Sequence, residues 1–155
     1  METSTNKGQS LFEAVIAIAM VSIILIAIVS TAVISVKNSS FSRNKTLAAK
    51  IGQDTVEWLR GERDANWDLF STTVSGVSNE TVSSPVWCMP NLEWTQIGPC
   101  GDSDKIEGTI FKRQLDFETL SSKEIQATIT ISWDDSQGYH EIKLVTYFSD
   151  WRDNK

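Results

Sequence analysis

The sequence has few of the residues that build catalytic and metal sites. Its 155 residues include one histidine and two cysteines, and His140 lies far along the chain from both cysteines, so a zinc site is poorly supported. The chain also has no nucleophile–histidine motif, Walker loop, Rossmann fingerprint or zinc-binding helix motif. We therefore predict that the protein is not an enzyme and that it holds no cofactor and no metal.

An excess of basic residues is also missing. The net charge is −6, and residues 37–155 carry 18 acidic and 13 basic side chains, so we expect no nucleic-acid partner. Asp102, Asp104 and Glu107 form a small acidic cluster. A calcium site is the weaker interpretation of this cluster because the glycine and the ligand spacing of an EF-hand are absent; a solvated acidic turn is favoured.

Charge, proline and glycine are all absent from residues 14–36, which are aliphatic apart from Ser and Thr. Glu13 precedes this run, and no ionisable side chain follows it until Lys37. A helix over residues 11–36 would be roughly 39 Å long, enough to cross a bilayer core of about 30 Å. The run is longer than the apolar region of a secretory signal peptide and no A-x-A pattern follows it. It predicts a retained membrane helix.

The residues that flank this run and the two cysteines predict opposite topologies. Lys37, Arg43, Lys45 and Lys50 follow the run with no acid among them, and only Lys7 precedes it. Counted by the positive-inside rule, these charges would place the C-terminal part in the cytoplasm. A disulfide would place it outside the cytoplasm, and we give the disulfide more weight.

Cys88 and Cys100 enclose a short loop with two prolines and one glycine. Such a loop favours a disulfide, worth about 3 kcal/mol in the chain-entropy model; two buried free thiols are the alternative. Trp87 flanks this loop and Trp94 lies inside it. These tryptophans either form an exposed binding surface or pack into the core, and packing is favoured.

The next segment continues as an amphipathic helix. Ala48, Ile51, Thr55 and Leu59 recur at helical spacing, and no turn separates them from the apolar run. We predict one helix from about residue 10 to 62, ending near Gly61. Trp58, Trp133 and Trp151 are placed as core residues.

Alternation of apolar and polar residues predicts strands toward the C-terminus. Residues 124–133 place Ile129, Ile131 and Trp133 on one face, and residues 139–148 form the next strand after a five-residue loop, DDSQG. An earlier strand, near residues 109–118, has an apolar face interrupted by Arg113. Residues 71–107 read as irregular loops or a weak strand pair. The fold class is α+β: a long N-terminal helix packed on a small antiparallel meander.

Gly8 is followed five residues later by Glu13, which stands at the head of the long aliphatic run. This pattern resembles the N-terminal processing motif of type IV pilin-like proteins. The resemblance implies that a prepilin peptidase cleaves between Gly8 and Gln9 and that Gln9 becomes N-methylated. It divides the chain into a leader peptide (1–8), a transmembrane and assembly helix (9–36) and a soluble pilin-like domain (37–155).

Two further features bear on the subtype. The segment from Trp133 to Trp151, with a tryptophan at each end of a turn and strand, looks like the small minor pilins and minor pseudopilins. The usual aromatic first residue of the mature chain is replaced by Gln9, which is more tolerable in a minor subunit than in the main one.

The role of Glu13 has two interpretations. A carboxylate near a helix start interacts favourably with the helix dipole, worth about 0.3–1 kcal/mol, without needing a partner. The resemblance instead implies a partner, the amino terminus of a neighbouring mature subunit, which would set the axial register of a filament.

The resemblance implies a structural subunit of a type IV pilus-like or type II secretion filament. Its expected partners are prepilin peptidase, membrane lipids and other pilin or pseudopilin subunits. It would start in the inner membrane as a single-pass protein, with its C-terminal domain outside the cytoplasm, and then enter a periplasmic or cell-surface filament. The alternative is a non-polymerising, membrane-anchored binding module that uses the disulfide loop of residues 87–100.

Overall fold

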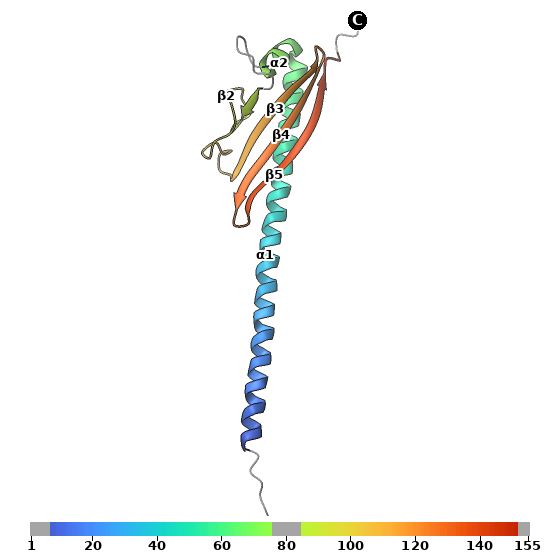
Figure 1. The fold of residues 1–155 in the computed structure, drawn as a ribbon. Coiled ribbons are helices and arrows are strands. Elements are labelled where there is room, and N and C mark those ends of the chain that lie inside the picture. Colours follow the sequence, from blue (N-terminus) through green and yellow to red (C-terminus); the bar gives the residue numbers. More distant parts are fainter. Residues whose placement is uncertain (1–6, 76–84, 152–155) are drawn as a thin grey trace, which may run out of the picture. The chain divides into compact units, whose positions relative to one another are not determined.

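The computed structural model describes residues 7–75 and 85–151 of the chain, with side chains from residue 11 onward. The chain divides into two compact units, Met1–Arg43 and Asn44–Lys155. The first unit contains the start of helix α1 (Lys7–Ala65), which continues into the second unit. The second unit also holds helix α2 and the sheet shown in Figure 1.

Helix α1 is continuous, as predicted, but the predicted end at Gly61 is wrong because the helix runs on to Ala65. Gly61 is exposed on the helix surface. A single glycine in a helix interior costs only about 1 kcal/mol relative to alanine, so it does not by itself stop a helix. The break falls at Asn66, whose backbone is extended (φ −159°, ψ 107°).

A second helix, α2 (Trp67–Val74), follows at once and was not predicted. Asn66 caps it, because its side-chain oxygen accepts a hydrogen bond from the Leu69 N–H at 3.0 Å. Phe70 and Val74 are buried along one side of this helix. Eight residues are too few to give a clear helical periodicity, so the asparagine cap was the one local signal.

The sheet has five antiparallel strands in the order β2-β1-β3-β4-β5. The predicted meander is confirmed as its three long strands, which run side by side in Figure 1. The predicted meander was incomplete, because two short strands from the region predicted to be irregular extend the sheet. The strands are β1 (Val86–Cys88), β2 (Gln96–Ile97), β3 (Phe111–Ser121), β4 (Glu124–Asp135) and β5 (Gly138–Ser149).

The loop between β4 and β5 is shorter than predicted. Asp135 pairs with Gly138, which leaves a two-residue turn in place of the predicted five-residue loop. Gly138 has φ 114°, a backbone angle that favours glycine. The Asp135 side chain accepts a hydrogen bond from the Gln137 N–H at 2.8 Å, and this bond is the main reason that the pKa of Asp135 is lowered.

The core lies between one face of the sheet and the C-terminal part of α1, residues 44–65. Ile129, Ile131 and Trp133 are buried as their alternation predicted. Ala48, Thr55 and Leu59 are buried on the facing stripe of the helix, with Ile51 half-buried. The helix approaches β5 closely at Gly52, where an added Cβ would lie 2.7 Å from Leu144 Cδ1.

One predicted core residue is not in the core. The Trp151 side chain is 58% exposed, and its indole N–H donates to Asp64 Oδ1 at 3.4 Å. It follows the last strand, so no neighbouring strand covers it. Trp133, by contrast, sits inside β4 and is 1% exposed.

Candidate functional site

The N-terminal part of α1 exposes all of its large apolar side chains. Between Leu11 and Val36 their exposed fractions run from 38% to 71%. The helix is long enough and apolar enough to cross a membrane. Two of its hydroxyl groups are turned back on the helix: Ser22 donates to the Ile18 carbonyl at 2.8 Å and Thr31 donates to the Ile28 carbonyl at 2.8 Å. The surface of this segment is therefore almost purely aliphatic.

Glu13 is the one ionisable residue within residues 11–36, and it is exposed. Among the side chains that the structure describes, Glu13 has no hydrogen bond or ion pair. The predicted cleavage position, between Gly8 and Gln9, lies in the first turns of α1, outside the residues whose side chains are described. Four basic side chains that follow this segment along α1 are exposed: Lys37, Arg43, Lys45 and Lys50.

The two cysteines form the predicted disulfide, and the alternative of two free thiols is wrong. Cys88 is buried at the end of β1, and Cys100 is half-buried beyond β2. The enclosed loop connects β1 and β2, which pair as a small hairpin with Cys88 opposite Gln96 and Trp87 opposite Ile97. The disulfide therefore closes a structured addition to the edge of the sheet.

The tryptophans of this loop are packed, so the favoured interpretation is confirmed and an exposed aromatic surface is wrong. Trp87 is 4% exposed and Trp94 is half-buried. The ring of Trp94 lies 5.1 Å from that of Trp58 and 5.2 Å from that of Trp87. Its indole N–H donates to Glu62 Oε2 at 2.9 Å. Trp94 thus joins the loop to α1.

The hydrogen bonds of Arg113 were not predicted from the sequence. Its side chain is 5% exposed and sits in the apolar face of β3. It donates to the carbonyl oxygens of Met89 at 2.9 Å and Pro90 at 3.3 Å, and to Thr55 Oγ1 at 3.1 Å. Burial lowers the pKa of the guanidinium. The sequence did contain a signal for these bonds. A charged residue at an inward position of an alternating strand needs hydrogen-bond acceptors inside the protein.

The acidic cluster of residues 102–107 is engaged in local contacts. Asp102 pairs with Lys112 at 2.8 Å, and this hydrogen bond lowers the pKa of Asp102. Asp104 accepts from the Gly101 N–H at 2.7 Å, which lowers its pKa too. Within residues 7–75 and 85–151, no three His, Cys, Asp or Glu side chains are grouped so as to hold a metal ion.

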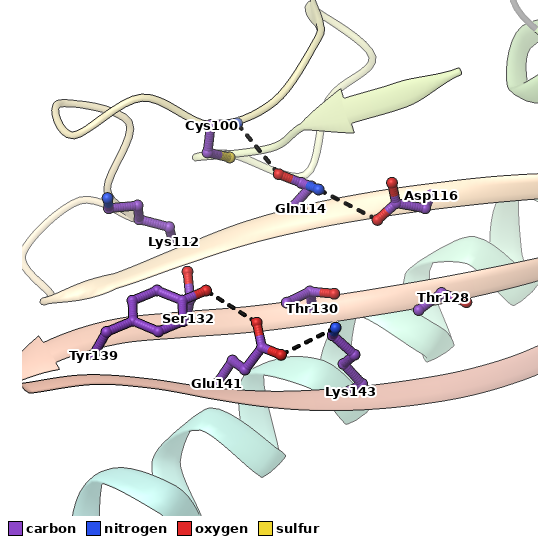
Figure 2. Close-up of a pocket in the computed structure, with 10 residues that line it drawn as sticks. All are labelled: Cys100, Lys112, Gln114, Asp116, Thr128, Thr130, Ser132, Tyr139, Glu141 and Lys143. Atoms are coloured by element: carbon purple, nitrogen blue, oxygen red, sulfur yellow. Dashed lines mark hydrogen bonds and ion pairs between the residues drawn. The ribbon is translucent and has the colours of Figure 1, made fainter. Parts of the chain in front are cut away.

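The outward face of the sheet carries a polar recess, drawn in Figure 2. Thr128, Thr130 and Ser132 lie along its floor on β4, with Gln114 on one side and Lys143 on the other. The volume of the recess is about 460 Å³. Sequence reasoning assigned no role to this face, because a row of Thr and Ser on a strand is typical of an ordinary solvated surface.

Comparison with known protein families, curated proteins and solved structures gives no match to this chain. The function must therefore be argued from the aliphatic helix, the disulfide-closed unit and the recess themselves.

Proposed function

We propose that the chain is a structural subunit, a minor pilin or pseudopilin, of a type IV pilus-like or type II secretion filament. In this proposal the aliphatic part of α1 first anchors the protein in the inner membrane. It then packs among the same helices of neighbouring subunits. Prepilin peptidase cleaves between Gly8 and Gln9, and the new amino terminus is methylated.

One observation carries the proposal: Glu13 is the one charge within residues 11–36 of α1, a segment whose large apolar side chains are all exposed. Lipid tails or other apolar helices can cover the aliphatic surface, but neither offers Glu13 a charge partner. An ionised carboxylate that is buried without a partner is strongly unfavourable. The amino terminus of a neighbouring processed subunit is a cation that lies at the same end of the helix, so pairing would set the register between subunits.

The disulfide supports the location that this proposal gives to the soluble unit, outside the cytoplasm. Disulfides persist in oxidising compartments and are rare in the cytoplasm. Cys88 and Cys100 are bonded, which favours a soluble unit outside the cytoplasm over the orientation suggested by Lys37 and Arg43.

The alternative of a non-polymerising binding module has less support. That alternative relied on the loop of residues 87–100, and its two tryptophans are packed against α1 and the sheet. Ile97, which is 62% exposed, is the large apolar side chain that the loop still presents.

The test removes the charge of Glu13 in cells that assemble the filament. We expect Glu13→Ala and Glu13→Gln to reduce the amount of this protein in the sheared filament fraction at least about tenfold. A tenfold decrease corresponds to a loss of about 1.4 kcal/mol in the free energy of incorporation. The membrane-bound pool should rise correspondingly. Glu57→Gln is the matched control, because it removes an exposed acid from the same helix. Glu13 variants recovered in filaments at the wild-type level would contradict the register role.

Processing is checked separately by mass spectrometry. The mature chain should begin at Gln9 and carry one added methyl group. An intact Met1 in cells that contain prepilin peptidase would contradict membership of a processed filament.

A further inference from the structure

The recess on the outward face of the sheet results from the lengths of the side chains in register there. Thr130 lies on the central strand β4 and pairs with Gln114 of β3 and with Lys143 of β5. Paired residues of adjacent strands point to the same face, so a short side chain lies between two long ones. Thr128 and Ser132 continue the short floor along β4. Short side chains in the middle and long ones at the rim leave the hollow.

The floor of the recess contains an uncommitted hydroxyl. Thr130 is 9% exposed, and its hydroxyl makes no hydrogen bond to any residue that the structure describes. A hydroxyl can donate one hydrogen bond and accept two. Because the recess is open to solvent, the Thr130 hydroxyl is available to water or to a ligand that enters the recess.

Two lysines and two carboxylates line the recess. Asp116 accepts a hydrogen bond from the Gln114 amide at 3.3 Å, and the other three charges are in ion pairs. Lys112 pairs with Asp102 at 2.8 Å, and Lys143 pairs with Glu141 at 3.0 Å. The hydrogen bond with Asp102 raises the pKa of Lys112, and the hydrogen bond with Glu141 raises the pKa of Lys143. Lys112 and Lys143 balance Asp116 and Glu141 in the lining of the recess, so a charged ligand gains little at this site.

One end of the recess presents an aromatic ring. Tyr139 is 59% exposed, and its hydroxyl donates to Glu141 Oε2 at 3.0 Å (Figure 2). This bond holds the hydroxyl beside the rim. Three strands and three successive outward positions span about 10 Å by about 14 Å, which suits a ligand of one or two sugar rings.

A peptide strand fits this place poorly. Strand addition needs a free backbone edge, and β4 is paired with β3 on one side and with β5 on the other. The recess therefore offers side chains only: hydroxyl and amide groups of both donor and acceptor character, balanced charges and one ring.

We propose that this recess binds a neutral saccharide. The hydroxyls of Thr128 and Thr130 and the amide of Gln114 bond to sugar hydroxyls, and Tyr139 packs against the apolar C–H face of a sugar ring. Saccharides combine closely spaced hydroxyl groups with such apolar faces, which is the combination that the recess presents. The inference does not depend on assembly into a filament.

The experiment uses the full chain in a zwitterionic phosphocholine detergent, because maltoside and glucoside detergents are themselves saccharides. The protein is applied to an array of immobilised neutral, sialylated and sulfated glycans. A neutral glycan that is retained is then titrated in solution, and its Kd is measured for the wild type and for three variants. Thr130→Val removes the floor hydroxyl at nearly constant size, Tyr139→Ala removes the ring, and Thr119→Val is an exposed control outside the recess.

We expect the wild type to bind at least one neutral glycan. Thr130→Val and Tyr139→Ala should each raise the Kd at least about fivefold, in keeping with the loss of one buried hydrogen bond or one ring contact, while Thr119→Val leaves it unchanged. Should Thr130→Val fail to fold, the exposed Tyr139→Ala decides the result. Retention of no neutral glycan, retention of charged glycans only, or binding that neither recess variant alters would overturn the proposal.

Discussion

Two regions of this protein differ in whether their apolar side chains are exposed or buried and in whether a charge among them has a partner. The first, residues 11–36 of α1, exposes every large aliphatic side chain and carries one charge, Glu13, without a described partner. The second, Asn44–Lys155, contains a buried apolar core between helix and sheet. It also contains a charge in apolar surroundings, Arg113, but satisfies it internally with three acceptors.

The difference indicates what each charge is for. Arg113 ties α1, β3 and the disulfide loop together inside one unit, so its role is explained by the chain itself. Among the side chains that the structure describes, none plays this part for Glu13. In the proposed function, the aliphatic surface and the carboxylate are covered by partners outside the chain: lipid first, then other subunits of the filament.

The contrast between the two regions would not hold if the second unit needed the first in order to fold. All of the buried apolar side chains lie from Ala48 to Phe148, so a fragment of residues 44–155 should fold, form the Cys88–Cys100 disulfide and remain in the soluble fraction. The full chain should be recovered entirely with membranes. Cell fractionation, thiol labelling and circular dichroism measure these outcomes. An unfolded fragment, or one that still sediments with membranes, would show that the two regions are not independent.

The two charges should respond differently to removal. Arg113→Ala leaves the Met89 and Pro90 carbonyls without their donor and opens a cavity, so the free energy of unfolding should fall by about 3 kcal/mol. Arg113→Met keeps most of the volume and should lose about 1–2 kcal/mol. Glu13→Ala should change the unfolding of the soluble unit by less than about 0.5 kcal/mol.

Near-ultraviolet circular dichroism of the tryptophans during denaturation follows these changes in the full chain held in micelles. An equal loss of stability in the Ala and Met variants would assign the whole effect to the hydrogen bonds. No loss in either variant would remove the structural role given to Arg113.

Two glycines of α1 give the smallest and most local test. Gly52 faces Leu144, where a Cβ would come within 2.7 Å of Cδ1, whereas a Cβ at Gly61 would meet nothing within 4 Å. Gly52→Ala forces the Leu144 side chain to shift, and this overpacking, about 1–3 kcal/mol, should outweigh the gain in helix propensity of about 1 kcal/mol and lower the stability. Gly61→Ala should raise it by about 0.5–1 kcal/mol, because alanine is the better helix former. Melting temperatures of the two variants should move in opposite directions, and shifts of the same sign would mean that helix and sheet do not approach as closely as described.

Long periodic elements were predictable because their signals are repeated many times. The run from Leu11 to Val36 contains no helix breaker, and the alternation through Ile129 and Ile131 marks one face of a strand over several residues. Short elements were not predictable, since α2 and the strands β1 and β2 are each too short to show a period. The turn after Asp135 was placed too wide because Asp and Gly mark a turn without giving its length.

Sequence alone determined the division of the chain into an aliphatic helix and a polar unit, the three long strands and the candidate disulfide, because these depend on composition and local pattern. Only the tertiary structure decided that Cys88 bonds to Cys100, that Trp87 and Trp94 pack inside, and that Arg113 finds its acceptors on α1 and the loop. It also decided that Thr130 lies on the floor of a recess. Each of these depends on residues distant in sequence meeting in register, and pairing across strands is set by the packing of the whole unit rather than by any single segment.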